Sequence, residues 1–223
     1  MDTRIFAEDV LLSIGAVPVT ATMVTSLAVS IALVGLALAL RTGLRRSDSS
    51  TPAALAFLAV EWIDDLVRQV AGRTSPALET LAGSLFAFIA ACNLSSELPG
   101  VRAPTASLAT TSALAAIVFL AVPAAGVRAH GLGGYLRGYF RPNPLFAPLH
   151  LLSELSRTLA LSMRLFGNVV SGQLVVALLV ALTGFLVPMP LMALDLLIGL
   201  LQAYIFTVLT VVYVGAALRA VET

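Results

Sequence analysis

Long uncharged apolar runs alternate with short polar segments along this chain, and several runs are as long as a membrane span. A helix needs about 20 mainly apolar residues to cross a bilayer. The uncharged runs at 19–40 and 103–127 meet this length. The uncharged run between Glu79 and Glu97 is a little short, so we expect its span to extend slightly past that run, over 78–96. We therefore predict three membrane-spanning helices over these ranges.

The segment at 52–73 has a different pattern, because one helical face is charged. Glu61, Asp64, Asp65 and Arg68 follow one another at spacings of i, i+3, i+4 and i+7. The opposite face is apolar and contains Leu55, Leu58, Ala59, Trp62, Ile63, Leu66, Val67 and Val70. This pattern predicts an amphipathic helix that lies on the membrane surface. A helix packed on other protein is the alternative.

The last third of the chain predicts two long helices, at 145–186 and 190–219, separated by Pro188 and Pro190. The first is much longer than an upright span requires at about 1.5 Å per residue, so we expect it to be tilted or bent. The chain as a whole, residues 1–223, is then a single all-α integral membrane domain. It has five membrane-embedded helices and one amphipathic surface helix, and its last two helices form a long, tilted hairpin.

Composition supports this fold class and excludes others. Charged residues make up 11% of the chain, whereas soluble domains carry roughly 25%. The net charge of +1 argues against a nucleic-acid partner. The single cysteine, Cys92, lies in an apolar run and is expected to be a packed hydrophobe.

The arginines predict the orientation of the chain. All thirteen basic residues are arginine, and nine of them fall on segments that the predicted spans place on one side. By the positive-inside rule that side is the cytoplasm. We therefore expect the N-terminus outside and the C-terminus in the cytoplasm. The segment before the first span lacks a basic n-region, so that span is expected to be retained.

Arg164 is the residue that most needs an explanation. It lies inside the long apolar run, and no charged residue follows it until Asp195. A charged side chain at membrane depth costs several kcal/mol, so such residues usually face a protein interior or a wet cavity. Arg164 is therefore a candidate functional residue.

Other polar residues group around Arg164 by helical geometry. Asn168 shares its face, Gln173 is turned to the other side, and Gln202 reaches its level from the last helix. Asp195 falls nearer the outer surface, at a level close to Gln173. The inner side carries His150 and Glu154, together with Arg157.

Two polar clusters on opposite sides of one fixed charge suggest two aqueous half-paths with a barrier between them. Structural readings remain open for several of these residues. Arg164 is a possible structural partner of Asp195, and Glu154 a possible partner of Arg157. Asn168 and Gln202 are possible interhelical hydrogen-bonding residues.

The sequence from Ser156 to Asn168, with Arg164-Leu165-Phe166-Gly167-Asn168 at its end, closely resembles the signature of subunit a of F-type ATP synthases. The run from Leu201 to Thr210 resembles that family's last helix. Pro18-Val19-Thr20, Asn93-Leu94 with Pro99-Gly100, and Gly131-Leu132-Gly133-Gly134-Tyr135 look like further landmarks.

The resemblance implies a bacterial inner-membrane stator subunit beside a ring of c subunits, with peripheral stalk subunit b and other ATP synthase subunits as partners. It also implies a part in ATP synthesis or hydrolysis through ion flow, with no catalytic ATP site and no cofactor or metal in this chain. Arg164 would face the ring carboxylates, with Asn168 and Gln202 as neighbours. The outer half-channel would pass Asp195, Gln173, Asn93, Ser96 and Glu97, and the inner one His150 and Glu154.

The sequence departs from the family pattern in the outer half-channel. The family usually has Glu or His at the position of Gln173 and often has His or Glu at that of Asp195. One titratable group is thus kept on the last helix, which puts a role for Gln173 as a proton carrier in doubt. The transported ion stays open between H⁺ and Na⁺. A stand-alone secondary ion transporter is the alternative function, although no two repeated halves are visible. A purely structural scaffold is a third reading.

Overall fold

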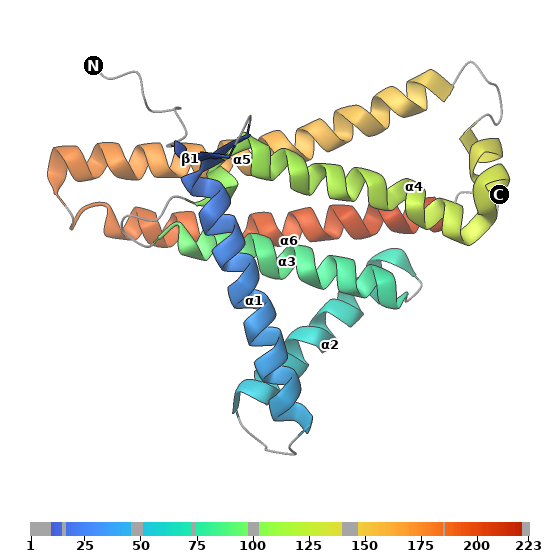
Figure 1. Cartoon of the computed structure of the whole chain (residues 1–223), viewed down its shortest axis with the longest axis horizontal. Coiled ribbons are helices and arrows are strands. Elements are labelled where there is room, and N and C mark those ends of the chain that lie inside the picture. Colours follow the sequence, from blue (N-terminus) through green and yellow to red (C-terminus); the bar gives the residue numbers. More distant parts are fainter. Residues whose placement is uncertain are drawn as a thin grey trace.

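The computed structural model describes residues 10–14, 17–45, 51–72, 75–97, 103–139, 147–184 and 186–219. The expected turn at Pro99-Gly100, the polar linker at 46–50 and the loop that holds Arg141 lie outside these residues. The helices are α1 (Ala21–Arg45), α2 (Thr51–Ala71), α3 (Pro76–Ser95), α4 (Leu108–Tyr139), α5 (Ala147–Thr183) and α6 (Met189–Arg219), with a short 3₁₀ turn, η2 (Pro104–Ala106) (Figure 1).

Five of these helices, α1, α3, α4, α5 and α6, are long and apolar enough to cross a membrane. The predicted class, an all-α integral membrane protein, is therefore confirmed. The apolar pattern did not predict the short antiparallel hairpin of β1 (Val10–Ile14) and β2 (Val17–Thr20) that precedes α1. The start of the predicted first span belongs to β2, and α1 begins only at Ala21.

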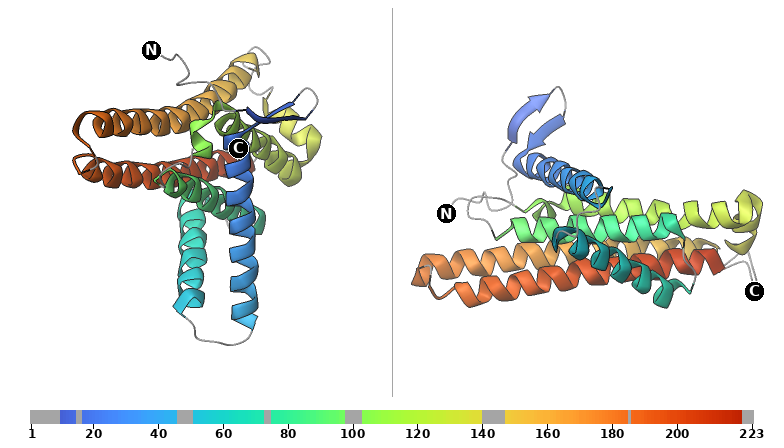
Figure 2. Two further views of the ribbon diagram at one scale, coloured as in Figure 1. Left: turned by 60° about the vertical axis from the view of Figure 1, so that its left-hand side comes forward. Right: turned by 90° about the horizontal axis from the view of Figure 1, so that it is seen from below.

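Four helices, α3 to α6, run side by side, and α1 crosses their direction (Figures 1 and 2). The 37 residues of α5 rise about 55 Å, whereas the hydrocarbon core of a bilayer is about 30 Å thick. A helix of this length must be strongly tilted to stay inside the bilayer. The 25 residues of α1 rise only about 37 Å and fit a nearly upright span.

The main core lies where α3, α4, α5 and α6 meet. Leu85 and Ile89 of α3 pack there with Leu161 and Leu165 of α5 and with Phe206 of α6. Phe206, Leu165 and Ile89 are fully buried. Leu165 is directed into this core, whereas the preceding residue on α5, Arg164, is exposed.

The amphipathic helix α2 packs partly on the protein itself. Ile63, Val67 and Ala71 are buried against α3 and α6, in a second core cluster with Val211 and Val214. Farther toward the start of α2, Phe57, Leu58 and Val60 are more than half exposed. The apolar face of α2 thus contacts protein in the second half of the helix, while large apolar side chains are exposed in its first half.

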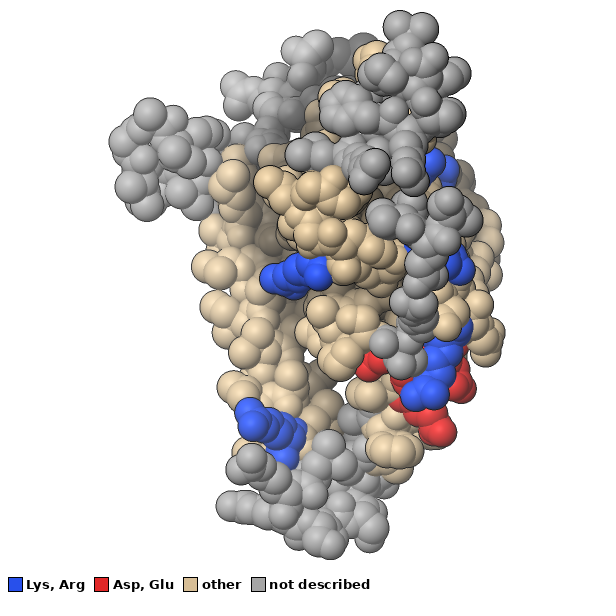
Figure 3. All heavy atoms as spheres, turned by 90° about the vertical axis from the view of Figure 1, so that its right-hand side faces the viewer, with Lys and Arg blue, Asp and Glu red and all other residues tan. Residues whose placement is uncertain are grey.

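The opposite face of α2 is charged. Arg68 Nε donates a hydrogen bond of 2.9 Å to Asp64 Oδ2, and Glu61 and Asp65 are exposed beside this pair. Figure 3 shows acidic side chains gathered in one region of the molecule, with basic side chains next to them. The predicted charged face is therefore present, and the position of α2 relative to a membrane stays a prediction.

The end of α4 turns sharply at Gly131, whose φ of +72° is rarely adopted by residues with a side chain. After the bend, the ring of Tyr135 lies against Gly126, where an added Cβ would overlap it. Nearby, His130 Nε2 is 2.9 Å from the Leu218 carbonyl oxygen, which joins the end of α4 to the end of α6.

We predict that Gly215→Leu destabilises the contact of α2 with α6. A Cβ at Gly215 would lie 3.1 Å from the Ala71 Cβ and 3.2 Å from its Cα. A leucine there must separate the two helices, at a cost of about 1–3 kcal/mol. Thermal unfolding of the protein in detergent measures the loss. Gly35→Leu is the matched control, because nothing lies within 4 Å of a Cβ at Gly35; an equal loss in both variants would contradict the prediction.

Candidate functional site

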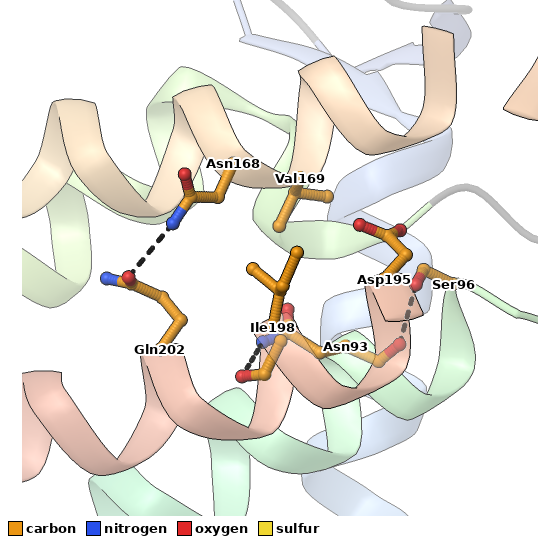
Figure 4. A pocket seen from close by; sticks show the side chains of 8 residues that line it. Asn93, Ser96, Asn168, Val169, Asp195, Ile198 and Gln202 are labelled. Atoms are coloured by element: carbon orange, nitrogen blue, oxygen red, sulfur yellow. Dashed lines mark hydrogen bonds between the residues drawn. The ribbon is translucent and has the colours of Figure 1, made fainter. Parts of the chain in front are cut away.

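A hydrogen bond between two amides joins α5 to α6 next to the candidate arginine. Asn168 Nδ2 donates to Gln202 Oε1 at 3.0 Å (Figure 4). Gln202 is buried and Asn168 is partly buried. The predicted approach of these two residues is therefore present in the structure, and it sets the register of the two antiparallel helices.

The amide nitrogen of Gln202 is not used in this hydrogen bond. Its Nε2 is buried and has no hydrogen-bond partner among the residues that the structure describes. Figure 4 shows this nitrogen turned away from Asp195. A buried donor without a partner costs about 1–3 kcal/mol.

Asn93 connects three elements on the side of Gln202 that lies toward Asp195 (Figure 4). Its Nδ2 donates to the Gly199 carbonyl oxygen at 2.7 Å, and its Oδ1 accepts a bond of 3.0 Å from the Thr105 hydroxyl. These bonds tie α3 to α6 and to η2. A Cβ at Gly199 would lie 2.9 Å from the Asn93 Cβ, so the close approach depends on the glycine. Asn93 therefore has a structural function in addition to lining the site.

Asp195 of α6 lies against Gly172 of α5. A Cβ at Gly172 would overlap the Asp195 carboxylate, so this carboxylate fits only because position 172 has no side chain. The sequence placed Asp195 at a level close to Gln173, and its contact with the adjacent residue agrees with that prediction. Asp195 is partly buried rather than enclosed.

These residues line one small cavity (Figure 4). Its free volume is about 10 Å³, which is room for about one water molecule. The lining residues are Asn93, Ser96, Asn168, Val169, Asp195, Ile198, Gly199 and Gln202. The structure therefore brings most of the predicted outer residues together, and Gln173 is not among those that line the cavity.

Glu97 belongs to the same outer group. It follows the last turn of α3, next to Ser96, and is partly buried. Burial raises the pKa of the Glu97 carboxyl, and the nearby negative charge of Asp195 raises this pKa further. Two carboxyl groups that interact electrostatically therefore lie just after the C-terminal end of α3 and in the first turns of α6.

Arg164 is exposed on α5, one helical turn before Asn168. Within the described part of the chain, no hydrogen bond or ion pair holds its guanidinium group. The reading of Arg164 as a structural partner of Asp195 thus finds no support in the contacts of these residues. The side chain of Arg164 is therefore directed away from the core of its own chain.

The predicted inner residues lie at the opposite end of α5 from Asp195. His150 is exposed and Glu154 is partly buried one turn later, so the two share a face of the helix. Arg157 lies with its Cζ 4.3 Å from the centre of the Tyr213 ring on α6. The structure thus places His150 and Glu154 together and far along α5 from the outer cavity.

Sequence reasoning missed three residues that shape the site: Gly172, Gly199 and Thr105. The two glycines had a visible signal, because each interrupts an apolar helix within seven residues of a polar candidate. Thr105 had no such signal in the sequence, because its hydrogen bond to Asn93 depends on η2 folding back toward α3.

We predict that Asp195→Asn lowers the pKa of Glu97 toward its ordinary value. The substitution removes the nearby negative charge but leaves the burial, which is the larger cause of the raised pKa. The pKa should therefore fall and stay above that of an exposed glutamate. Infrared pH titration of carboxyl bands, assigned with Glu97→Gln, measures it. Asp64→Asn, on the distant charged face of α2, should have no effect; an unchanged pKa in Asp195→Asn would refute the electrostatic contact.

Comparison with known proteins agrees with these features. The family model described as "ATP synthase A chain" matches residues 13–215. The protein named ATP synthase subunit a 2 from a Bradyrhizobium strain is 50% identical over 159 residues, which cover 71% of this chain and 70% of that protein. ATP synthase subunit a 1 of Chlorobaculum parvum is 39% identical over 220 residues, or 96% of both chains. Because the match extends over nearly the whole chain, the chain belongs to the ATP synthase A chain family.

Proposed function

We propose that this chain conducts ions through two offset half-channels against a rotating ring of c subunits, and so couples ion flow to ATP synthesis or hydrolysis. Its family takes part in ion translocation in F-type ATP synthases, and the chain is a multi-pass membrane subunit of that enzyme complex. The observation that carries the proposal is the exposed guanidinium of Arg164 on a helix that must lie within the membrane.

Arg164 is the fixed charge of this mechanism. A cation in an apolar environment favours an opposite charge nearby, and its own chain supplies no carboxylate partner among the described residues. A ring carboxylate that passes Arg164 is held in its ionised form by the positive charge. The carboxylate therefore releases its ion there, and Arg164 also repels cations that would leak directly between the half-channels.

The outer half-channel leads to the cavity beside Asp195. Asp195 and Glu97 offer two carboxyl groups near the outer surface, and Ser96 and Asn93 offer polar atoms deeper in. Gln173 is on the next position of α5 after Gly172 and has no lining role in this cavity. Asp195 is therefore the proposed ion-carrying group of the outer side.

The barrier between the half-channels is built from apolar and amide groups. Val169 and Ile198 stand between Asp195 and the Asn168–Gln202 hydrogen bond (Figure 4). The cavity has room for about one water molecule, which is too little for a continuous water path along the helices. An ion on the outer side must then leave through the ring rather than through this chain.

The inner half-channel passes His150 and Glu154 on the first turns of α5. These side chains lie roughly 15–20 Å from Arg164 along the helix axis, at about 1.5 Å per residue. Ions exchange there with the cytoplasm, in the orientation that the arginine distribution predicts. The membrane is the bacterial inner membrane, with the N-terminus outside and the C-terminus in the cytoplasm.

Stalk subunit b and the c-ring are the proposed partners, and ATP is bound elsewhere in the complex. The transported ion is H⁺ or Na⁺. The alternative, a stand-alone secondary ion transporter, predicts ion flux that needs no c subunit. The family membership of the chain favours the rotary complex over that alternative.

Arg164→Ala is expected to abolish both ion-driven ATP synthesis and ATP-driven ion pumping, because the ring carboxylate loses the charge that releases its ion. Both rates are measured in inverted membrane vesicles, with the amount of assembled complex checked by immunoblot. Arg68→Ala is the control: its pair with Asp64 is exposed and is worth about 0–1 kcal/mol. Normal coupling in Arg164→Ala would refute the proposed function.

Gly172→Ala is expected to slow ion-driven ATP synthesis about tenfold or more, because the added methyl group displaces the Asp195 carboxylate from the outer path and small displacements in such sites cost on the order of 100-fold. The same vesicle assay measures the rate. Gly133→Ala is the matched control, because nothing lies within 4 Å of a Cβ there. An unimpaired Gly172→Ala variant would exclude Asp195 in this position as an ion carrier.

A further inference from the structure

A hydrogen bond joins α5 to α4 shortly before Arg164. Ser162 Oγ donates to Thr111 Oγ1 at 3.3 Å, and both side chains are buried. The Thr111 hydroxyl in turn donates within its own helix, to the carbonyl oxygens of Ser107 and Leu108 at 3.3 and 3.2 Å. Thr111 therefore presents its oxygen to Ser162 as an acceptor.

This bond differs from those of nearby hydroxyl groups on α5 and α6. Thr158, Thr207 and Thr210 each donate to a carbonyl oxygen four residues earlier in their own helix. Such a bond satisfies the hydroxyl group without linking its helix to another one. Ser162 instead donates to a side chain of a different helix. Its bond therefore constrains how α5 lies against α4.

The neighbouring contacts between α4 and α5 are apolar. Leu114 of α4 belongs to the main core cluster together with Leu161 and Leu165 of α5. In a membrane, no hydrophobic driving force favours burial of one apolar helix face over another, because lipid tails are as apolar as leucine. A rotation of α5 would, however, leave the buried Ser162 hydroxyl without its acceptor. The hydrogen bond thus adds a directional preference to this contact.

Ser162 and Arg164 lie on nearly opposite faces of α5. Two residues turn an α-helix by about 200°, so a Ser162 hydroxyl held toward α4 directs the Arg164 guanidinium outward. Arg164 is exposed accordingly. On the other side of Arg164, Asn168 is bonded to Gln202 of α6. Hydrogen bonds to two different helices therefore flank the arginine, and together they set the register and the rotation of α5.

We propose that Ser162 and Thr111 are positioning residues for Arg164. Their hydrogen bond fixes the rotation of α5, so that the guanidinium stays directed toward the ring carboxylate. Both residues act on that carboxylate only through the direction of Arg164. This inference rests on the proposed function, in which Arg164 faces the ring and prevents a direct leak between the half-channels.

Passive ion leak through the assembled complex tests the direction of Arg164, because a guanidinium that is turned away no longer blocks the direct path. Thr111→Val keeps the branched shape and removes the acceptor. It should speed the decay of an imposed proton or sodium gradient in nucleotide-free inverted vesicles about three- to twentyfold, the range that interhelical hydrogen bonds in membranes span. Thr111→Ser keeps the hydroxyl group and should retain the leak rate of the parent.

Ser162→Ala removes the donor by a smaller change and tests the same bond where Thr111→Val lowers the amount of assembled complex. The double variant should leak no faster than the leakier single variant, because both substitutions break one interaction. Immunoblots measure the content of assembled complex, and leak rates are compared per complex. A purely structural function would lower this content and leave the leak rate per complex unchanged.

Thr210→Val is the matched control. It makes the same change at another buried threonine, whose hydroxyl donates to the Phe206 carbonyl oxygen of its own helix. Because this bond does not link two helices, the substitution should leave the leak rate per complex at the parental value.

Three outcomes would overturn the inference: a leak in Thr111→Val no faster than in Thr210→Val, a leak in Thr111→Ser as fast as in Thr111→Val, or single effects that multiply in the double variant. Arg164→Ala is tested in the same vesicles. If it stops coupled synthesis while the hydroxyl variants leak no faster than the parent, only the assignment of Ser162 and Thr111 fails. If Arg164→Ala couples normally, the proposed function itself fails.

Discussion

The hydrogen bond from Asn168 to Gln202 sets the position of nearly everything else in the site. It fixes how far α5 and α6 slide past each other, and the stacking of Arg157 on Tyr213 repeats the same register farther along. Interhelical hydrogen bonds in membranes are each worth only about 0.6–2 kcal/mol. The apolar packing around Phe206 must therefore also stabilise the contact between α5 and α6. In this register, Arg164 lies on α5 between two contacts with α6, the Asn168–Gln202 hydrogen bond and the Arg157–Tyr213 contact.

The same register brings Asp195 onto Gly172, and it brings Gly199 to Asn93. Both contacts depend on a missing side chain, since a Cβ at either glycine would meet the neighbouring polar group. The outer site is therefore built by close approach of helices rather than by a large hollow. The small free volume of the cavity follows from this close approach, and it supports the proposed barrier between the two half-channels.

The two sides of Arg164 are built differently. The outer side draws on α3, α5, α6 and the residues after α3, and it gathers Asn93, Ser96, Asp195 and Glu97 within one compact region. The inner side rests on α5, with α6 contributing the Tyr213 ring. An outer group held by several elements keeps a precise geometry, whereas the proposed inner residues His150 and Glu154 lie on a single helix.

Much of this was readable from residue order. The length of each apolar run predicted five embedded helices, because a bilayer demands about 20 apolar residues per span. The i, i+4 spacing placed Arg164 and Asn168 on one face, and the proline break between α5 and α6 predicted the hairpin that brings Gln202 to their level. The N-terminal β-hairpin was not predicted, because strands of four or five residues give only a weak alternating pattern next to a long apolar run.

By itself, then, the sequence determined the fold class, the long final hairpin and the isolated cation, since these follow from local hydrophobic period and from the cost of burying charge. Only the tertiary structure decided which partners the polar groups have. It joined Asn93 to Gly199 and Thr105, placed Asp195 on Gly172, left Gln173 outside the cavity, and put Arg157 on Tyr213. These pairings depend on how closely separate helices approach and at what register, and helical periodicity within one segment carries no information about either.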